Sequence, residues 1–213
     1  MAAAPGAGAW LPPAFLLSWR ETRSPAVNTL EALLQLLALD RLPRTGWLQA
    51  GVPLPETVAA HGHGVALVTL ALAPRVAPPL DADRAAALAV VHDAPEAWLG
   101  DLPRPGSRLL PPGAKREAEG RAAGELLGPL STLALDRYRE FDAGETREAR
   151  FVRLCDRLQM GVRMLGYARA GFRGLETFRQ TVAELDCSEF SPCQELRDAI
   201  LAALEEPGPP GGE

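Results

Sequence analysis

The sequence has 213 residues, 47% of them hydrophobic, and a formal net charge of −5 at pH 7. This length suffices for one domain with its own core, and no apolar run is long enough to span a bilayer. The negative charge, and the lack of a basic cluster with interleaved aromatics, argue against a nucleic-acid polymer as partner. Three cysteines without a CxxC pair fit a reducing compartment. We therefore expect a cytoplasmic protein.

The first part of the chain predicts a flexible arm followed by a helix. Residues 1–26 are rich in Pro, Gly and Ala, a composition typical of a poorly ordered segment. Asn28 is expected to cap a helix over residues 29–42, where apolar residues recur at helical spacing. Residues 43–55 contain turn-forming residues and are expected to connect this helix to the next one.

Two further helices are expected before the middle of the chain. The first has Pro55 at its first position and Glu56 in its first turn, where a carboxylate suits the helix dipole. The second covers residues 82–100 and is capped by Asp81. Pro95 is expected to strain or end it, because proline lacks a backbone N–H.

The second half of the chain also predicts helices, and the fold class is all-α. A proline-rich loop covers residues 101–113. Helical patterns then extend over residues 114–128, 131–142, 145–170 and 175–186, and a last helix begins at Ser191. The final residues, 207–213, are a low-complexity Pro/Gly tail that we expect to be disordered. The folded domain is therefore expected to span residues 27–206.

The most informative stretch is AVVHDAPEAWLGD, from Ala89 to Asp101. His92 and Asp93 are adjacent, so on a helix they point about 100° apart and can both reach one ion near the helix end. Glu96 follows His92 by four residues and shares its face. One short segment therefore brings an imidazole and three carboxylates, those of Asp93, Glu96 and Asp101, into one neighbourhood.

A divalent metal ion needs about four to six ligands, so other helices have to contribute. The candidates are His61 and Asp156. A mixed nitrogen and oxygen site suits Mn, Fe, Co, Ni or Zn better than Mg or Ca, which prefer oxygen alone. The alternative is that each histidine is an ordinary buried core residue, and no spacing rule decides between the two.

Four motifs resemble those of the HD-domain metal-dependent phosphohydrolases, and most closely the 5′-deoxynucleotidase branch of that family. They are LDRLPRTGW (residues 39–47), GVPLPETVAAH (51–61), HDAPEAWLGDLPRP (92–105) and EARFVRLCDRLQM (148–160). The family pattern is a histidine, a distant His-Asp pair and a later aspartate. The motifs occur in the order found in the family, and the resemblance implies an HD-domain helical bundle.

The resemblance also implies a role for each matching residue. One divalent ion would be held by His61, His92, Asp93 and Asp156. Family enzymes with two metals use extra histidines, and this chain has only His63 left, which is two residues from His61 and would face away on a helix. A single ion is therefore expected.

Four residues outside the ion-holding set match positions that act on the substrate. The resemblance places Glu96 and Asp101 near the attacking water and the leaving oxygen, Arg44 at the phosphate and Trp47 beside the sugar. Each also has a simpler interpretation. Arg44 and Glu96 could be surface charges, Trp47 could belong to the core, and Asp101 could cap a turn.

Two departures from the family pattern concern the metal-binding region. Gly62 and Gly64 lie where relatives carry bulkier or polar residues, and mid-helix glycines cost about 1 kcal/mol each relative to alanine. They would make room near the metal or permit close helix packing. Gln159 lies where relatives often have Glu, which suggests a lost ion pair and puts fine substrate specificity in doubt.

The expected activity is removal of phosphate from deoxyribonucleoside 5′-monophosphates, with a small-molecule nucleotide as substrate. One alternative is HD-type hydrolysis of another nucleotide, either a guanosine tetraphosphate alarmone or a cyclic nucleotide. The other is a non-catalytic helical module that binds a nucleotide or a protein. Relatives are often dimers, and the apolar helix face from Leu30 to Leu37 would serve either a homodimer interface or the core.

Overall fold

The computed structural model describes residues 25–205. The predicted tail and all but the last two residues of the predicted arm lie outside this range. The described residues form helices joined by short loops, as predicted, and none is in a β-strand. None of the described helices combines the length and apolar character that crossing a membrane requires.

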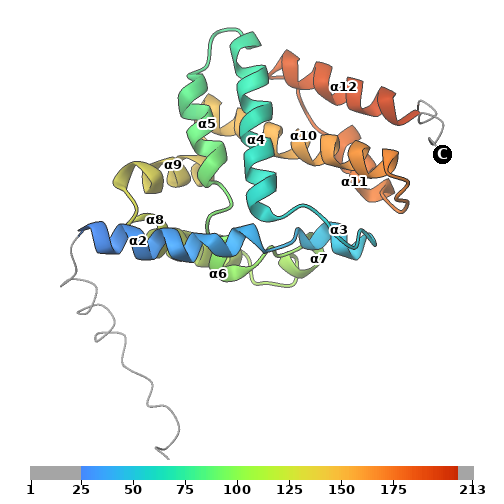
Figure 1. Ribbon diagram of the computed structural model, residues 1–213. Helices are drawn as coiled ribbons and strands as arrows, with labels where there is room; N and C mark the ends of the chain where they lie inside the picture. The colour runs from blue at the N-terminus through green and yellow to red at the C-terminus, as the bar shows by residue number, and fades with distance from the viewer. Residues whose placement is uncertain (1–24, 206–213) are drawn as a thin grey trace, which may run out of the picture.

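The helices follow one another in an order that Figure 1 traces from blue to red. Their bounds are α2 Pro25–Leu36, α3 Thr45–Gln49, α4 Val58–Leu72, α5 Ala82–Val91, α6 Glu96–Leu99, α7 Arg104–Ser107, α8 Ala114–Leu127, α9 Thr132–Ala143, α10 Arg147–Arg169, α11 Glu176–Ala183 and α12 Ser191–Glu205. Two short 3₁₀ helices cover Leu37–Asp40 and Ala73–Arg75.

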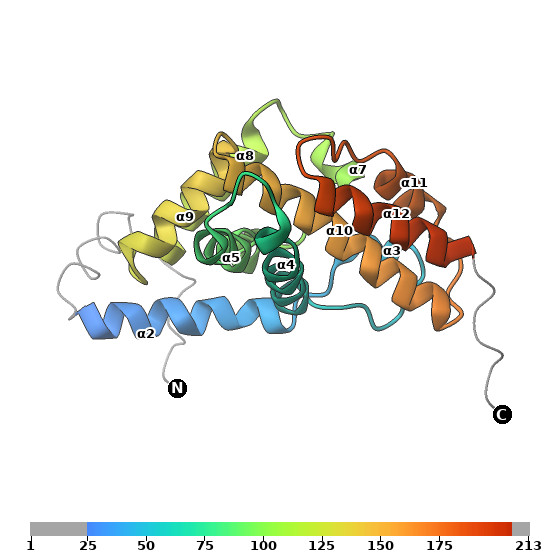
Figure 2. The ribbon, with the colours of Figure 1, turned by 90° about the horizontal axis from the view of Figure 1, so that it is seen from above.

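Helices α4, α5 and α10 form the centre of the bundle. In Figure 2, α4 and α5 are seen almost end-on and lie together against the long α10. Helix α4 buries His61, Val65, Thr69 and Leu72, which recur every three or four residues along one face. Helix α10 buries a similar face that includes Gln159. The polar residues His61 and Gln159 therefore lie in the packed interface between α4 and α10.

The first predicted helix has different bounds in the structure. Helix α2 begins at Pro25, so Asn28 lies inside it and does not cap it. The α-helix also ends at Leu36, where a 3₁₀ turn over Leu37–Asp40 replaces the predicted continuation to residue 42. Proline is well tolerated in the first turn of a helix, because the N–H it lacks has no partner there.

The predicted turn-rich segment contains a short helix. Helix α3 carries the buried Trp47. The segment is fixed at both ends by backbone hydrogen bonds: Arg44 N donates to Glu56 O at 3.0 Å, and Val58 N donates to Leu42 O at 2.9 Å. These bonds hold the chain extended through Glu56, so the prediction that α4 begins at Pro55 is wrong.

Thr57 caps α4 instead, and its hydroxyl accepts a hydrogen bond from Ala60 N at 3.2 Å. A threonine at this position satisfies one of the free N–H groups of the first turn. Glu56 is therefore not a solvated residue of that turn. Its side chain is buried among polar groups of other helices.

The predicted helix over residues 82–100 divides into two parts. Asp81 caps α5 as predicted, accepting from Arg84 N at 2.9 Å. Helix α5 ends at Val91, and α6 begins only at Glu96, after Pro95. Gly100 then ends α6 with a φ of 77°, a conformation that glycine adopts without strain. The break puts His92 at the C-terminal end of α5, where its side chain points into the molecule.

The remaining predicted helices are confirmed with small shifts of their ends. Helices α8, α9, α10 and α12 match their predicted ranges to within about two residues. Helix α11 ends at Ala183, three residues earlier than expected. The proline-rich loop contains one additional turn of helix, α7.

Candidate active site

The structure brings together four residues predicted to hold an ion. Ligand atoms of His61, His92 and Asp156 all lie within 4.8 Å of one another. Asp93 lies beside them, with its Oδ2 atom 3.1 Å from His92 Nε2 and 3.8 Å from His61 Nε2. The four residues come from α4, from the segment after α5 and from α10. Packing of three helices therefore creates a neighbourhood that no single helix could supply.

The His92 imidazole is held in one orientation. Its Nδ1 lies 2.7 Å from the backbone oxygen of Ala89, which can only accept a hydrogen bond, so Nδ1 donates. Its Nε2 is buried and faces Asp93, but that contact lacks hydrogen-bond geometry. Burial lowers the pKa of His92, yet the Asp93 carboxylate outweighs this effect and raises the pKa to about 9. The Nε2 atom thus lies in a strongly negative field.

The His61 imidazole is held in a similar way. Its Nδ1 lies 2.5 Å from Gln159 Oε1, and its Nε2 lies 2.9 Å from Asp156 Oδ1. Burial raises the pKa of Asp156, but the hydrogen bond to His61 is stronger and lowers it to about 2. Asp93 has a pKa well below its usual range, because His92 and Arg44 outweigh its burial. Both aspartates are therefore anionic at neutral pH.

Glu96 behaves differently from the two aspartates. It is buried at the start of α6, and its Oε2 has no hydrogen-bond partner among the described residues. Burial, together with the nearby Asp93 charge, raises the pKa of Glu96 to about 9. A carboxyl group with such a pKa keeps its proton at neutral pH and can give it to a neighbouring oxygen.

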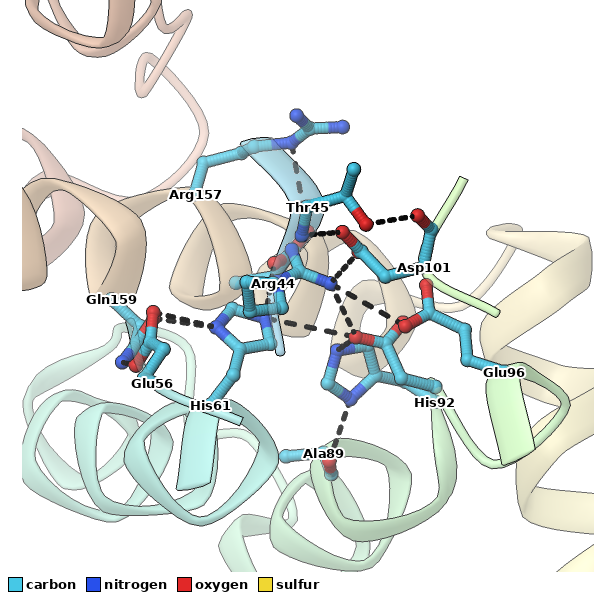
Figure 3. Close-up of polar contacts among 12 residues, drawn as sticks. Arg44, Thr45, Glu56, His61, Ala89, His92, Glu96, Asp101, Arg157 and Gln159 are labelled. Atoms are coloured by element: carbon cyan, nitrogen blue, oxygen red, sulfur yellow. Dashed lines mark hydrogen bonds and ion pairs between the residues drawn. The ribbon is translucent and has the colours of Figure 1, made fainter. Parts of the chain in front are cut away.

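Arg44 joins the carboxylates of this site. Its Nη1 lies 2.8 Å from Asp101 Oδ1, 3.2 Å from Asp93 Oδ2 and 3.6 Å from Glu96 Oε2. Asp101 also accepts from Thr45 N at 2.5 Å, and Thr45 Oγ1 donates to the Asp101 backbone oxygen at 2.8 Å. Figure 3 shows Asp101 between Arg44 and Thr45. Each carboxylate oxygen of Asp101 therefore accepts a hydrogen bond, and these bonds fix the start of α3.

Trp47 is buried, with 2% of its surface exposed. Its ring stacks on Phe178 of α11, with centroids 3.9 Å apart, and meets the edge of Tyr167. Its Nε1 donates to Glu56 Oε1 at 3.1 Å. The stack with Phe178 gives the pocket a rigid aromatic wall.

A pocket of about 450 Å³ opens over these residues. A volume of this order fits a small ligand such as a nucleotide. Its floor includes His61, Asp93, Glu96, Asp101 and Asp156. Further out it is lined by the basic residues Arg104, Lys115 and Arg157 and by apolar residues that include Trp47, Met160 and Phe178. The pocket thus combines an acidic floor with a basic and aromatic surround.

Sequence reasoning missed the polar groups behind the site. The Glu56 side chain accepts from Gln159 Nε2, Arg163 Nε and Trp47 Nε1. The sequence suggested only a helix-terminal role for Glu56, and for Gln159 a lost ion pair. Arg163 carried no signal, because its partner is 107 residues away along the chain.

The same family is found by comparison with known proteins. The family model described as HD domain matches residues 38–192, which is more than half of the chain. The chain belongs to the HD domain family. This HD domain is 32% identical over 146 residues to 5′-deoxynucleotidase HDDC2 of Xenopus laevis, covering 64% of this chain and 70% of the frog protein. It is 30% identical over 142 residues to 5′-deoxynucleotidase hdd1 of Schizosaccharomyces pombe, covering 63% and 69% of the two chains.

Two solved structures have a fold similar to that of this chain, which the family model identifies as an HD domain. The crystal structure of a Pyrococcus horikoshii OT3 protein superposes with a TM-score of 0.70 at 29% sequence identity, covering 82% of this chain and 99% of that one. A conserved hypothetical protein from Pyrococcus furiosus gives a TM-score of 0.69 at 30% identity, with 80% and 98% covered. The predicted HD-domain helical bundle is therefore confirmed.

Proposed function

We propose that this HD domain is a metal-dependent phosphomonoester hydrolase that removes phosphate from deoxyribonucleoside 5′-monophosphates. One observation carries the proposal: the Nε2 atoms of His61 and His92 both lie within 4 Å of Asp93 Oδ2, and His61 Nε2 also lies 2.9 Å from Asp156 Oδ1. Both aspartates line a nucleotide-sized pocket. The relatives named 5′-deoxynucleotidases supply the substrate class.

The donor set fits a divalent ion. With Nδ1 donating to Gln159, a neutral His61 presents a lone pair on Nε2 to Asp156 Oδ1 at 2.9 Å, so a proton or a cation has to lie between them. His61, His92, Asp93 and Asp156 would hold one ion, and this mixed set favours Mn, Fe, Co, Ni or Zn over Mg or Ca. Such an ion, when bound, lowers the pKa of a water and polarises a phosphoryl oxygen.

The residues around the ion-holding set would donate a proton, position other side chains and bind the phosphate. Glu96 is buried, its pKa is raised to about 9 by burial and by Asp93, and it would give a proton to the leaving 5′ oxygen. Asp101, the second predicted catalytic residue, has both oxygens bonded and would act by holding Arg44 and Thr45. Arg44 makes its carboxylate contacts through Nη1, so the rest of its guanidinium fork would face the phosphate.

The aromatic wall would decide between deoxyribose and ribose. Trp47 and Phe178 both line the pocket and stack on each other, so neither ring can move aside easily. We propose that the sugar packs against this wall, where a 2′-hydroxyl would be excluded by shape. Discrimination by shape alone is modest, in the range of about 10-fold to 200-fold.

The proposal is tested by phosphate release from matched dAMP and AMP. Protein stripped with a chelator and supplied with Mn or Co should release phosphate from dAMP at least about 10-fold faster than from AMP. Equal rates would contradict exclusion of the 2′-hydroxyl by the aromatic wall, but would still support the hydrolase activity. Parallel assays on a cyclic nucleotide and on a guanosine tetraphosphate alarmone test the other HD reactions. If none of the four nucleotides is hydrolysed with any metal, the result would favour a non-catalytic binding module.

Other expectations from the sequence stay predictions. These are a homodimer, a cytoplasmic location, and the lack of a nucleic-acid polymer as partner. Within α2, Leu30, Leu33 and Leu34 are about half exposed, so a homodimer interface on this face is still open to test.

A further inference from the structure

Gln159 contacts His61 on the side away from the pocket. The two side chains are 4% and 1% exposed, and Gln159 Oε1 lies 2.5 Å from His61 Nδ1. An amide oxygen can only accept a hydrogen bond, so His61 Nδ1 must donate to it. This bond leaves the Nε2 atom of a neutral His61 without a proton, facing Asp156.

Glu56 determines which way the Gln159 amide points. Gln159 Nε2 donates to Glu56 Oε2 at 2.9 Å, and the same oxygen accepts from Arg163 Nε at 2.8 Å. The other Glu56 oxygen accepts from Trp47 Nε1. Turning the amide over would place its oxygen against a carboxylate, so only one orientation is favourable. Figure 3 shows Glu56, Gln159 and His61 side by side, with His61 between this pair and His92.

Gly64 makes room for the Gln159 side chain. A Cβ atom at position 64 would lie 2.7 Å from Gln159 Nε2 and 2.9 Å from its Cγ, closer than real Cβ contacts allow. A Cβ at Gly62, on the same helix, would meet only the Ala89 backbone oxygen, at 4.0 Å. The two glycines therefore differ: only Gly64 is required for Gln159 to reach His61.

We propose that Gln159 is the positioning residue of the metal site. Glu56 orients the Gln159 amide, and Gly64 leaves space for its side chain. Gln159 then holds His61 in the tautomer and orientation that present Nε2 to the ion. This inference rests on the proposed function, because it assigns a partner to one of the four ion-holding residues. Groups that orient metal-ligating histidines typically contribute about 10-fold to 100-fold to metal affinity.

The test measures Co²⁺ affinity by calorimetry on chelator-stripped protein. Gln159→Met keeps the side-chain length and removes both polar atoms, and should weaken binding about 10-fold to 100-fold. Gly64→Ala should weaken it similarly, whereas the matched Gly62→Ala should bind as the wild type does. Gln159→Ala should weaken binding as Gln159→Met does. In Gly64→Ala/Gln159→Ala the clash is relieved, so folding should be normal while affinity stays as low as in Gln159→Ala.

A second measurement follows the tautomer directly. Nitrogen NMR of the chain loaded with diamagnetic Zn²⁺ should show His61 protonated on Nδ1 and binding through Nε2 in the wild type, and a mixture of Nδ1 and Nε2 protonation in Gln159→Met. The inference is overturned if Gln159→Met keeps both the wild-type tautomer and the wild-type affinity, or if Gly62→Ala and Gly64→Ala weaken binding equally. Wild-type protein that binds no Co²⁺ would instead overturn the proposed metal site itself.

Discussion

Replacing Asp156 with Asn should abolish tight metal binding and, with it, phosphate release from dAMP. Asp156 supplies an anionic oxygen to the group whose ligand atoms lie within 4.8 Å, and its pKa of about 2 keeps it charged. An amide of the same shape cannot replace that charge. Because outer partners of metal ligands already contribute up to about 100-fold, loss of a direct ligand should cost more than about 100-fold in affinity and rate.

The control for Asp156→Asn is the same change at an exposed position. Asp198 lies on α12 with 55% of its side chain exposed. Asp198→Asn should keep wild-type metal affinity and rate. Circular dichroism should show native helix content in both variants, which separates loss of the ion from loss of the fold. Wild-type affinity in Asp156→Asn would show that the ion binds elsewhere.

Replacing Glu96 with Gln should stop the chemistry while leaving the metal site in place. Glu96 is buried, and its pKa of about 9 makes it a proton donor at neutral pH. Glutamine has the same shape but cannot transfer a proton to the leaving oxygen. General acid catalysis typically contributes about 100-fold to 10,000-fold, and kcat should fall by that amount with KM and Co²⁺ affinity nearly unchanged.

The pH profile of Glu96→Gln provides an independent check. A general acid must keep its proton, so the wild-type rate should fall on the alkaline side as Glu96 ionises, and this limb should be missing in the variant. Glu117→Gln is the matched control, because Glu117 lies on α8 with 65% of its side chain exposed. A rate in Glu96→Gln within a few-fold of wild type would show that Glu96 is not the general acid, and that another group protonates the leaving oxygen.

The sequence predicted which residues meet in the candidate site better than the contacts among them. His61, His92, Asp93 and Asp156 were identifiable because they carry the family motifs, and Pro95 indicated the break that turns His92 inward. The helices with strong apolar periodicity were also predictable. Helix α3 was not, because its five residues contain one glycine and few helix formers, and backbone bonds to distant residues hold it in place.

The roles of Glu56 and Gln159 could not be predicted for a related reason. Because Glu56 follows a proline, the sequence predicts a solvent-exposed carboxylate in the first turn of a helix. The three groups that donate hydrogen bonds to its side chain come from residues 9, 103 and 107 positions away. Gln159 looked like the loss of an ion pair, whereas the structure shows a hydrogen-bonded link between His61 and Glu56. Contacts of this separation leave no local pattern in a sequence.

We infer that one ion, held by His61, His92, Asp93 and Asp156, makes this HD domain a phosphohydrolase. The most direct measurement titrates Co²⁺ into chelator-stripped protein while recording visible absorption and phosphate release from dAMP. Both signals should rise together and reach a plateau at one Co²⁺ per chain. Phosphate release that survives chelation, or a plateau only at two ions per chain, would contradict a phosphohydrolase that uses one metal ion.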